Sequence, residues 1–257
     1  MMKIASDSTR LERRLGPLDA GTLVVGTIIG TGIFLKTSTM AQHLGSMKMV
    51  MFAWILSGIL SYAGALTYAE LAARLPESGG EYAMLNHAYG QRFGHLLGFL
   101  FGWMRFWIGS PGSIAAYGVA VATFLTGLFH VDSIPGGRPL IAIFFIALFS
   151  AINCFQVRFG ANVQNFLTFL KMILILGLAL GAGLFGTTPD VALPSLTQTS
   201  TALSMESGIS AFGMAMIAAL WAFDGWNSLP MVGGEIRDPQ KNIPIALGIG
   251  MLAVITL

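Results

Sequence analysis

The feature that most constrains this chain is a series of long apolar runs separated by short polar segments. A helix rises about 1.5 Å per residue, so roughly 20 apolar residues cross the hydrocarbon core of a bilayer. None of the runs alternates as the strands of an outer-membrane barrel do. The predicted spans are 18–44, 49–73, 96–129, 139–157, 165–185 and 209–232. We therefore expect an all-α polytopic membrane protein.

Composition agrees with a membrane protein and excludes several other classes. Only 10% of the residues are charged, whereas soluble domains carry about 25%. A net charge of +2 without a basic face argues against nucleic-acid binding. Cys154 is the only cysteine, so the chain has no internal disulfide, and we expect this thiol to be buried. The spans contain no nucleophile or metal-binding spacing, which predicts no enzyme activity, no metal and no cofactor.

The chain divides into a polar tail, 1–17, and a membrane domain, 18–257. The last 14 residues, from Pro244, are apolar but too short for a complete span. We expect six complete spans and an incomplete seventh, in a truncated chain.

Lysine and arginine predict the orientation, because cytoplasmic loops are enriched in both. With the N-terminus in the cytoplasm, two basic residues lie outside, Lys48 and Arg138. Nine lie inside: Lys3, Arg10, Arg13, Arg14, Arg74, Arg92, Arg158, Arg237 and Lys241. The N-terminus is therefore predicted to be cytoplasmic.

The first span contains an unusual run of glycines in the segment GTIIGTGIF, residues 26–34. The spacing of Gly26 and Gly30 fits the small-residue pattern that lets membrane helices pack closely. A phosphate-binding loop is excluded because the third glycine of its motif is missing and no strand precedes it. A third reading is a broken helix, in which glycines on both sides of Thr31 free backbone groups to line a cavity. The spacing alone leaves the packing and broken-helix readings open.

The sixth span repeats the interruption. Asp224 and Gly225 lie in its middle, and Pro230 follows. An intramembrane aspartate is costly unless it is paired or functional. Two interrupted spans in corresponding halves of a chain indicate the binding site of an inverted-repeat transporter.

Four stretches carry a family resemblance across nearly the whole chain. They are GTIIGTGIF at 26–34, ALTYAELAARLPESGGEY at 65–82, NCFQVRFGANVQNFLTFLK at 153–171 and WAFDGWNSLPMVGGEIRDPQKNIPIA at 221–246. The chain resembles permeases of the amino acid-polyamine-organocation superfamily, in particular bacterial relatives of the L-type amino acid transporters. The resemblance implies a LeuT-type inverted-repeat fold, with the first repeat and the start of the second in this chain. Eukaryotic relatives use an external cysteine to bind a heavy chain; residues 130–138 contain none, so we expect no such partner.

A broken helix suits an amino acid, because it presents N–H groups at the start of one half and carbonyls at the end of the other. We expect the substrate carboxylate at Thr31, Gly32 and Ile33, next to Gly30. The ammonium is expected at carbonyls near Ile28 and around the second break, and the predicted residues there are Trp221, Ala222 and Asp224. The resemblance also implies that Trp221 is a substrate gate, although ordinary packing between helices is an alternative.

Lys171 lies inside the fifth span. Its stem could extend to the interface and leave the charge in water. The resemblance instead implies that its ammonium replaces a bound sodium ion and hydrogen-bonds carbonyls freed in the first span.

The predicted function is a secondary transporter that moves amino acids across the cytoplasmic membrane by alternating access. Sodium-independent exchange and proton-coupled uptake are both open. The alternatives are a membrane channel and a truncated fragment that does not transport. Outside the site, an ion pair is expected between Glu70 and Arg74, one helical turn apart.

Overall fold

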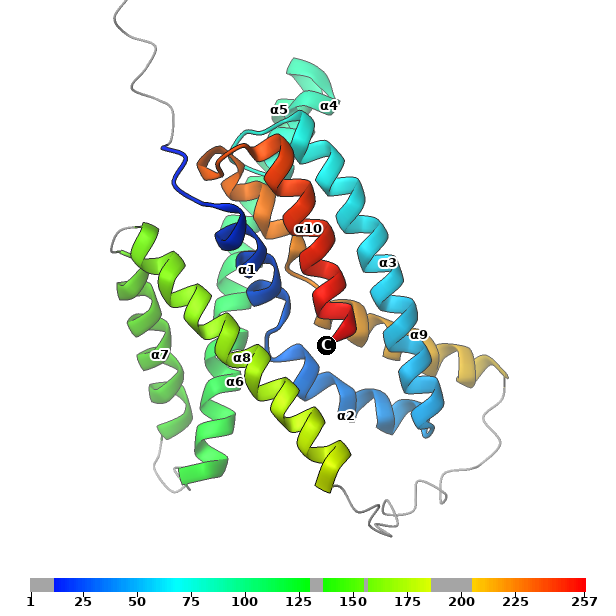
Figure 1. Cartoon of the computed structure of the whole chain (residues 1–257). Coiled ribbons are helices and arrows are strands. Elements are labelled where there is room, and N and C mark those ends of the chain that lie inside the picture. The colour runs from blue at the N-terminus through cyan, green and yellow to red at the C-terminus, as the bar shows by residue number, and fades with distance from the viewer. Residues whose placement is uncertain (1–11, 130–135, 155–156, 186–204) are drawn as a thin grey trace, which may run out of the picture. The chain divides into compact units, whose positions relative to one another are not determined.

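The computed structural model describes residues 12–129, 136–154, 157–185 and 205–257 (Figure 1). Within these ranges the regular elements are helices, with one isolated parallel β-bridge. The chain divides into two compact units: Met1–Ser78 with Gln164–Leu257, and Gly79–Val163. The first eleven residues lie outside the described part, as do residues 130–135 and 186–204, which belong to the loops after the third and fifth predicted spans. Most of the segment expected to lack a heavy-chain cysteine is therefore also outside it.

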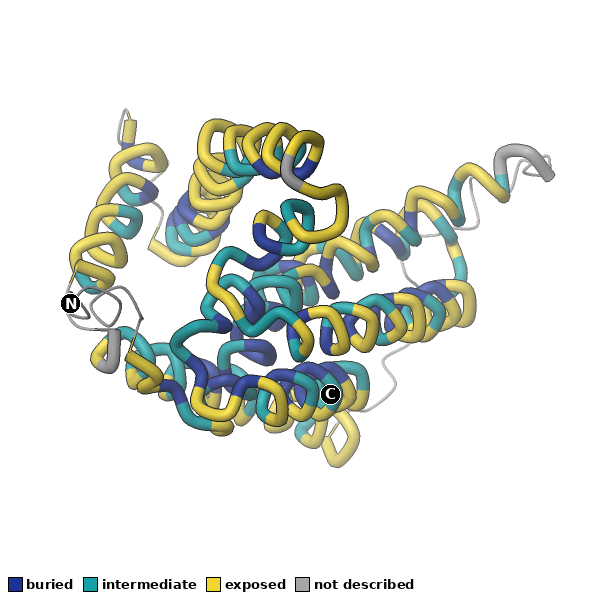
Figure 2. The backbone as a smooth tube through the Cα atoms, turned by 90° about the horizontal axis from the view of Figure 1, so that it is seen from above, coloured by how far each residue is buried: buried dark blue, intermediate teal, exposed yellow. Residues whose placement is uncertain are grey.

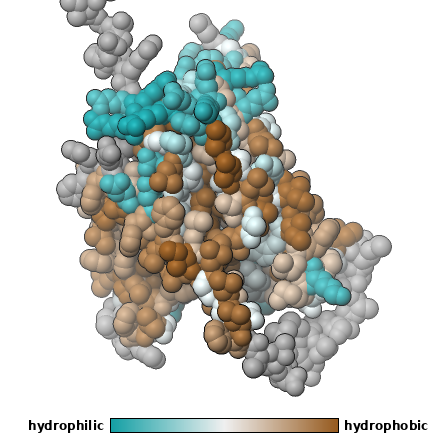
Figure 3. Space-filling model, in the orientation of Figure 1, coloured by the Kyte–Doolittle hydropathy of each residue, from teal (hydrophilic) through white to brown (hydrophobic). Residues whose placement is uncertain are grey.

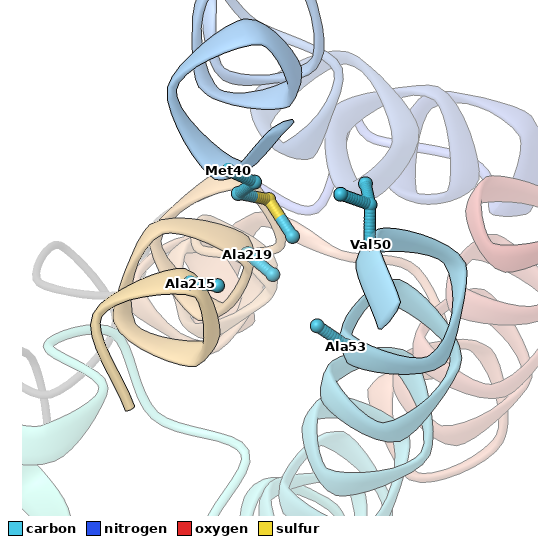
Figure 4. Close-up of a cluster of buried hydrophobic side chains, with 5 residues drawn as sticks. All are labelled: Met40, Val50, Ala53, Ala215 and Ala219. Carbon is cyan, nitrogen blue, oxygen red and sulfur yellow. The ribbon is translucent and has the colours of Figure 1, made fainter. Parts of the chain in front are cut away.

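The first unit contains both interrupted spans. Its elements are α1 (Pro17–Ile28), α2 (Gly32–Leu44), α3 (Met47–Arg74), most of α8 (Val157–Phe185), α9 (Met205–Ala222), the 3₁₀ helix η5 (Trp226–Glu235) and α10 (Pro239–Thr256). Helix α10 packs against both α1 and α3, and α9 packs against both α2 and α3 (Figure 1). A buried cluster joins α2, α3 and α9 (Figure 4), made by Met40, Val50, Ala53, Ala215 and Ala219. Its alanines let the helix backbones approach closely.

The second unit contains the predicted third and fourth spans. Its elements are α4 (Glu81–Ala88), the π-helix η1 (Gly90–Gly94), α5 (His95–Met104), the π-helix η2 (Arg105–Gly109), α6 (Ser110–Phe129) and α7 (Gly137–Asn153). The long third predicted span is irregular, since η2 ends at Gly109, two residues before Pro111 in the first turn of α6. π-Helical turns are a recognised cause of helix kinks.

Among the described residues, five segments are long and apolar enough to cross a membrane, and α7, at the fourth predicted span, is a shorter apolar helix of 17 residues. Large apolar side chains are exposed along them, including Phe106 and Leu128, each about 70% exposed. Figure 2 marks exposed positions along most helices, and in Figure 3 apolar residues make up much of the visible face. Soluble proteins rarely expose apolar patches this large. The expected all-α membrane fold is confirmed.

Two helix starts differ from the sequence prediction by five residues or more. Helix α8 begins at Val157 rather than 165, and α10 begins at Pro239 rather than Pro244. Proline is well placed at the first helical position, where its missing N–H needs no partner. The seventh helical segment is therefore 18 residues long, not 14.

The segment before α1 is joined to the segment after η5. The Leu15 N–H donates to the Glu235 carbonyl at 3.0 Å, and the Arg237 N–H donates to the Leu15 carbonyl at 2.9 Å. These bonds form the parallel bridge between Leu15 and Ile236. Helix α1 then starts at Pro17, and the Asp19 carboxylate accepts the Gly16 N–H at 2.9 Å.

Candidate functional site at the two helix breaks

The first span is broken between α1 and α2. The Ile29 N–H still donates to Val25, but the Gly30 N–H donates to the carbonyl of Ile28 at 2.8 Å. The next helical bond runs from the Leu35 N–H to the Thr31 carbonyl at 3.0 Å. The first N–H groups of α2 therefore have no acceptor within the helix. The broken-helix reading of this segment is confirmed.

The second break separates α9 from η5. The chain turns at Phe223, Asp224 and Gly225, where Gly225 has a φ of 125°. L-amino acids with a side chain rarely adopt this angle, so the turn depends on glycine. The Ser228 N–H donates back to the Gly225 carbonyl at 3.0 Å and starts the tighter helix. The sequence thus locates both interruptions at the correct residues.

The two breaks touch each other within the first unit. A Cβ atom added to Gly225 would lie 2.8 Å from the Thr27 carbonyl oxygen, and one added to Gly32 would lie 2.8 Å from the Cα atom of Ala222. The Thr27 hydroxyl lies 3.1 Å from the Gly225 carbonyl and can donate to it. Glycines on both spans therefore permit a backbone approach that any side chain would prevent.

Lys171 of α8 connects to the first break. Its ammonium donates to the Gly26 carbonyl at 2.8 Å and to the Ile29 carbonyl at 2.6 Å. The expected contact with carbonyls freed in the first span is present. An ammonium at membrane depth thus compensates carbonyls that the broken helix leaves unpaired.

Gly26 has a separate role in packing. A Cβ atom there would lie 2.2 Å from the Thr168 hydroxyl and 2.3 Å from the Gln164 amide nitrogen. Thr168 is fully buried, one turn before Lys171. The close-packing reading of the glycine run therefore holds at Gly26, while the broken-helix reading holds around Gly30.

The structure brings the eight residues predicted to bind substrate to the two breaks. Gly32 and Ala222 are buried, whereas Trp221 and Asp224 are exposed. The carbonyl of Ile28 already accepts the Gly30 N–H, which leaves it one further acceptor position. The Trp221 ring has a partner on the first span, because the Lys36 ammonium lies 4.5 Å from its centroid.

Several residues of the site escape the sequence prediction. They are the Ile29 carbonyl, Thr27, Gln164 and Thr168. One signal was available for part of this set: Gln164, Thr168 and Lys171 have the spacing of one helix face, polar within an apolar span. Such a stripe indicates a polar partner on a neighbouring helix.

Two predictions outside the breaks have clear outcomes. Glu70 and Arg74 form the expected exposed ion pair at 2.6 Å. The expected burial of Cys154 is wrong, since the thiol is exposed. Among the described residues no group of three or more His, Cys, Asp or Glu side chains could hold a metal ion.

The sequence comparisons identify the family. Residues 15–257 match the model of the amino acid permease family. The chain belongs to this family. It is 34% identical to the serine/threonine exchanger SteT of Bacillus subtilis, over 97% of this chain and 53% of the relative. Human b(0,+)-type amino acid transporter 1 is 31% identical, over 95% of this chain and 49% of its own length.

Human Asc-type amino acid transporter 1 is 30% identical, over 96% of this chain and 47% of its own length. The chain thus spans about half the length of the curated relatives it matches. The resemblance to the amino acid-polyamine-organocation superfamily is confirmed, and the matched proteins are transporters rather than enzymes.

Proposed function

We propose that this protein is a secondary transporter that binds a free amino acid between the two helix breaks and moves it across the cytoplasmic membrane by alternating access. The observation that carries the proposal is the contact between the breaks, with Gly225 against Thr27 and Gly32 against Ala222. The N–H groups at the start of α2 and the remaining acceptor position of the Ile28 carbonyl then lie at the same break, and a zwitterion needs both a donor and an acceptor. Exchange of small neutral amino acids is the first mode to test, since one relative is named a serine/threonine exchanger.

Each predicted residue has one role in this proposal. The N–H groups of Thr31, Gly32 and Ile33 hold the carboxylate at the positive end of α2. The carbonyl of Ile28 and the turn from Trp221 to Asp224 receive the ammonium, with Gly30 giving the chain its bend. No covalent chemistry is needed.

Counterflow in liposomes tests the proposal. Vesicles loaded with unlabelled L-serine should accumulate labelled L-serine or L-threonine, and the D-isomers should compete poorly. A protein extended to the length of its relatives and the 257-residue chain are measured side by side. Flux through the extended protein that does not saturate and ignores stereochemistry would favour a channel instead.

Lys171 in this proposal replaces a coupling cation, so transport should not require sodium. In the extended protein, Lys171→Ala should lose most of the transport rate while it still inserts and folds, because two carbonyls of the first break lose their partner. Lys48→Ala, which removes an exposed cation, is the matched control. Sodium-dependent uptake with Lys171 intact, or unchanged kinetics in Lys171→Ala, would contradict this role.

We also propose a cytoplasmic N-terminus, a tail at 1–17 and a membrane domain at 18–257. In a Cys154→Ser background, Pro139→Cys should react with an impermeant maleimide in intact cells, and Lys241→Cys only after lysis. Both positions are exposed, so reactivity reports on sidedness. The reverse pattern would invert the topology.

A further inference from the structure

Besides Lys171, a second lysine, Lys36, lies near the first break. The hydrogen bonds described at that break do not involve it and give it no role. It lies in α2, four residues after Gly32, and is half-buried. Four residues correspond to about 6 Å along a helix axis. Its Cα atom is therefore about one turn beyond the start of α2, and its side chain leans back toward that start.

The interaction that the structure gives to Lys36, among the described residues, is with an aromatic ring. The ammonium lies 4.5 Å from the centroid of Trp221, within the roughly 6 Å over which a cation is attracted to an indole face. Trp221 directly precedes Ala222, the residue that Gly32 touches. Cation and ring thus lie side by side at the point where the two broken spans meet.

The two cations near the first break are bound in different ways. Lys171 has two short hydrogen bonds to backbone carbonyls, at 2.8 and 2.6 Å. Lys36 has a ring contact, which is weaker and less directional. Trp221 is also 45% exposed, so the described residues pack against only part of it. Strong bonds suit a fixed support, whereas a weak contact to an exposed ring suits a part that opens and closes.

We propose that Lys36 is a positioning residue that holds the Trp221 indole in place beside the breaks, so that the Lys36–Trp221 pair is a latch on access to them from that side. This inference depends on the proposed function only in taking the two breaks to be the substrate site. The free energy of the Lys36–Trp221 contact sets the fraction of time that the ring is turned away from the breaks. A cation–π contact of this kind corresponds to roughly a 5- to 30-fold shift between latched and open positions.

The test measures how fast a reporter thiol at the first break reacts in intact cells. The reporter is Thr31→Cys in a Cys154→Ser background, modified by the cationic reagent MTSET and, separately, by the anionic reagent MTSES. Lys36→Met keeps a similar stem but removes the charge, and it should raise both rates about 5- to 30-fold. Lys36→Arg keeps a cation for the ring and should stay within about twofold of Lys36.

Two further variants separate the latch from other effects. Trp221→Leu should raise both rates to the same level, and Lys36→Met should add nothing to it. Lys48→Met removes a cation that has no ring contact in the described structure and should leave both rates unchanged. The latch is refuted by unchanged rates in Lys36→Met, by opposite changes with the two reagents, or by an effect that persists without Trp221.

The same reporter separates this inference from the proposed function. Release of the latch is measured without any amino acid present. Protection of the Thr31→Cys thiol by L-serine tests substrate binding independently. If L-serine protects the thiol but Lys36→Met has no effect, the proposed function stands and the latch is refuted. If Lys36→Met raises the rates but L-serine gives no protection, the latch stands and the proposed function is refuted.

Discussion

The two helix breaks solve the same problem by different means. At the first, the freed carbonyls of Gly26 and Ile29 are bound by a charged side chain from another helix, Lys171. At the second, the backbone itself turns at Gly225 and continues as a 3₁₀ helix. One break therefore depends on an interaction that a side chain supplies, and the other on the absence of a side chain. Substitutions should damage them by different mechanisms and to different extents.

The largest effect is expected from Gly225→Ala. Alanine at this position would have to adopt a φ of 125°, and its methyl group would lie 2.8 Å from the Thr27 carbonyl oxygen. Strain and a backbone clash together should cost about 3 kcal/mol or more of the free energy of unfolding. Unfolding in detergent, followed by circular dichroism, measures the loss. Gly248→Ala, in α10 with no neighbour within 4 Å, is the control and should be neutral or slightly stabilising. Equal stability of the two variants would contradict the account of the second break.

A smaller loss is expected from Gly26→Ala at the first break. Its methyl group meets side-chain atoms of Thr168 and Gln164 rather than backbone, so these side chains can partly adjust. Overpacking of this kind costs about 2 kcal/mol. The triple variant Gly26→Ala, Thr168→Ala, Gln164→Ala should recover part of that loss in the same unfolding measurement. The three single variants are measured as well, and their losses in the free energy of unfolding are added. If the triple variant loses as much as this sum, close packing is not the reason for glycine at position 26.

The smallest effect is expected from Thr27→Val, which removes the hydroxyl that links the breaks. This hydroxyl has one hydrogen and three acceptors in reach, at Leu23, Val24 and Gly225, so the link to Gly225 is shared. Hydrogen bonds between membrane helices average about 0.6 kcal/mol, which sets the expected loss. The bond that the described residues give to the Thr37 hydroxyl is to the Ile33 carbonyl of its own helix, so Thr37→Val is the matched control. If Thr37→Val loses as much of the free energy of unfolding as Thr27→Val, or more, the hydrogen bond between Thr27 and Gly225 contributes nothing to stability.

The breaks were predictable because glycine and aspartate are conspicuous in an apolar span. The side chains that pack on Gly26 were not predictable, since Thr168 is 142 positions further along the chain (168 − 26) and approaches it only through packing between helices. Hydropathy also marks membrane boundaries rather than helix ends, so α10 extends five residues further into the polar segment than predicted. Burial of Cys154 was wrong for a related reason: a lipid-facing side of a helix is as apolar as a core, so apolar surroundings in sequence do not imply burial.

The pairing of Leu15 with Ile236 has a mechanical consequence. Helix α1 is attached to the sixth span at two places, through this bridge near its first residue and through Thr27 and Gly225 near its last. The two attachments differ in strength, because the bridge has two backbone hydrogen bonds whereas the Thr27 hydroxyl shares its one hydrogen with carbonyls of its own helix. We therefore expect Leu15 and Ile236 to stay paired when a bound molecule displaces the breaks, so that a movement of η5 also moves the start of α1.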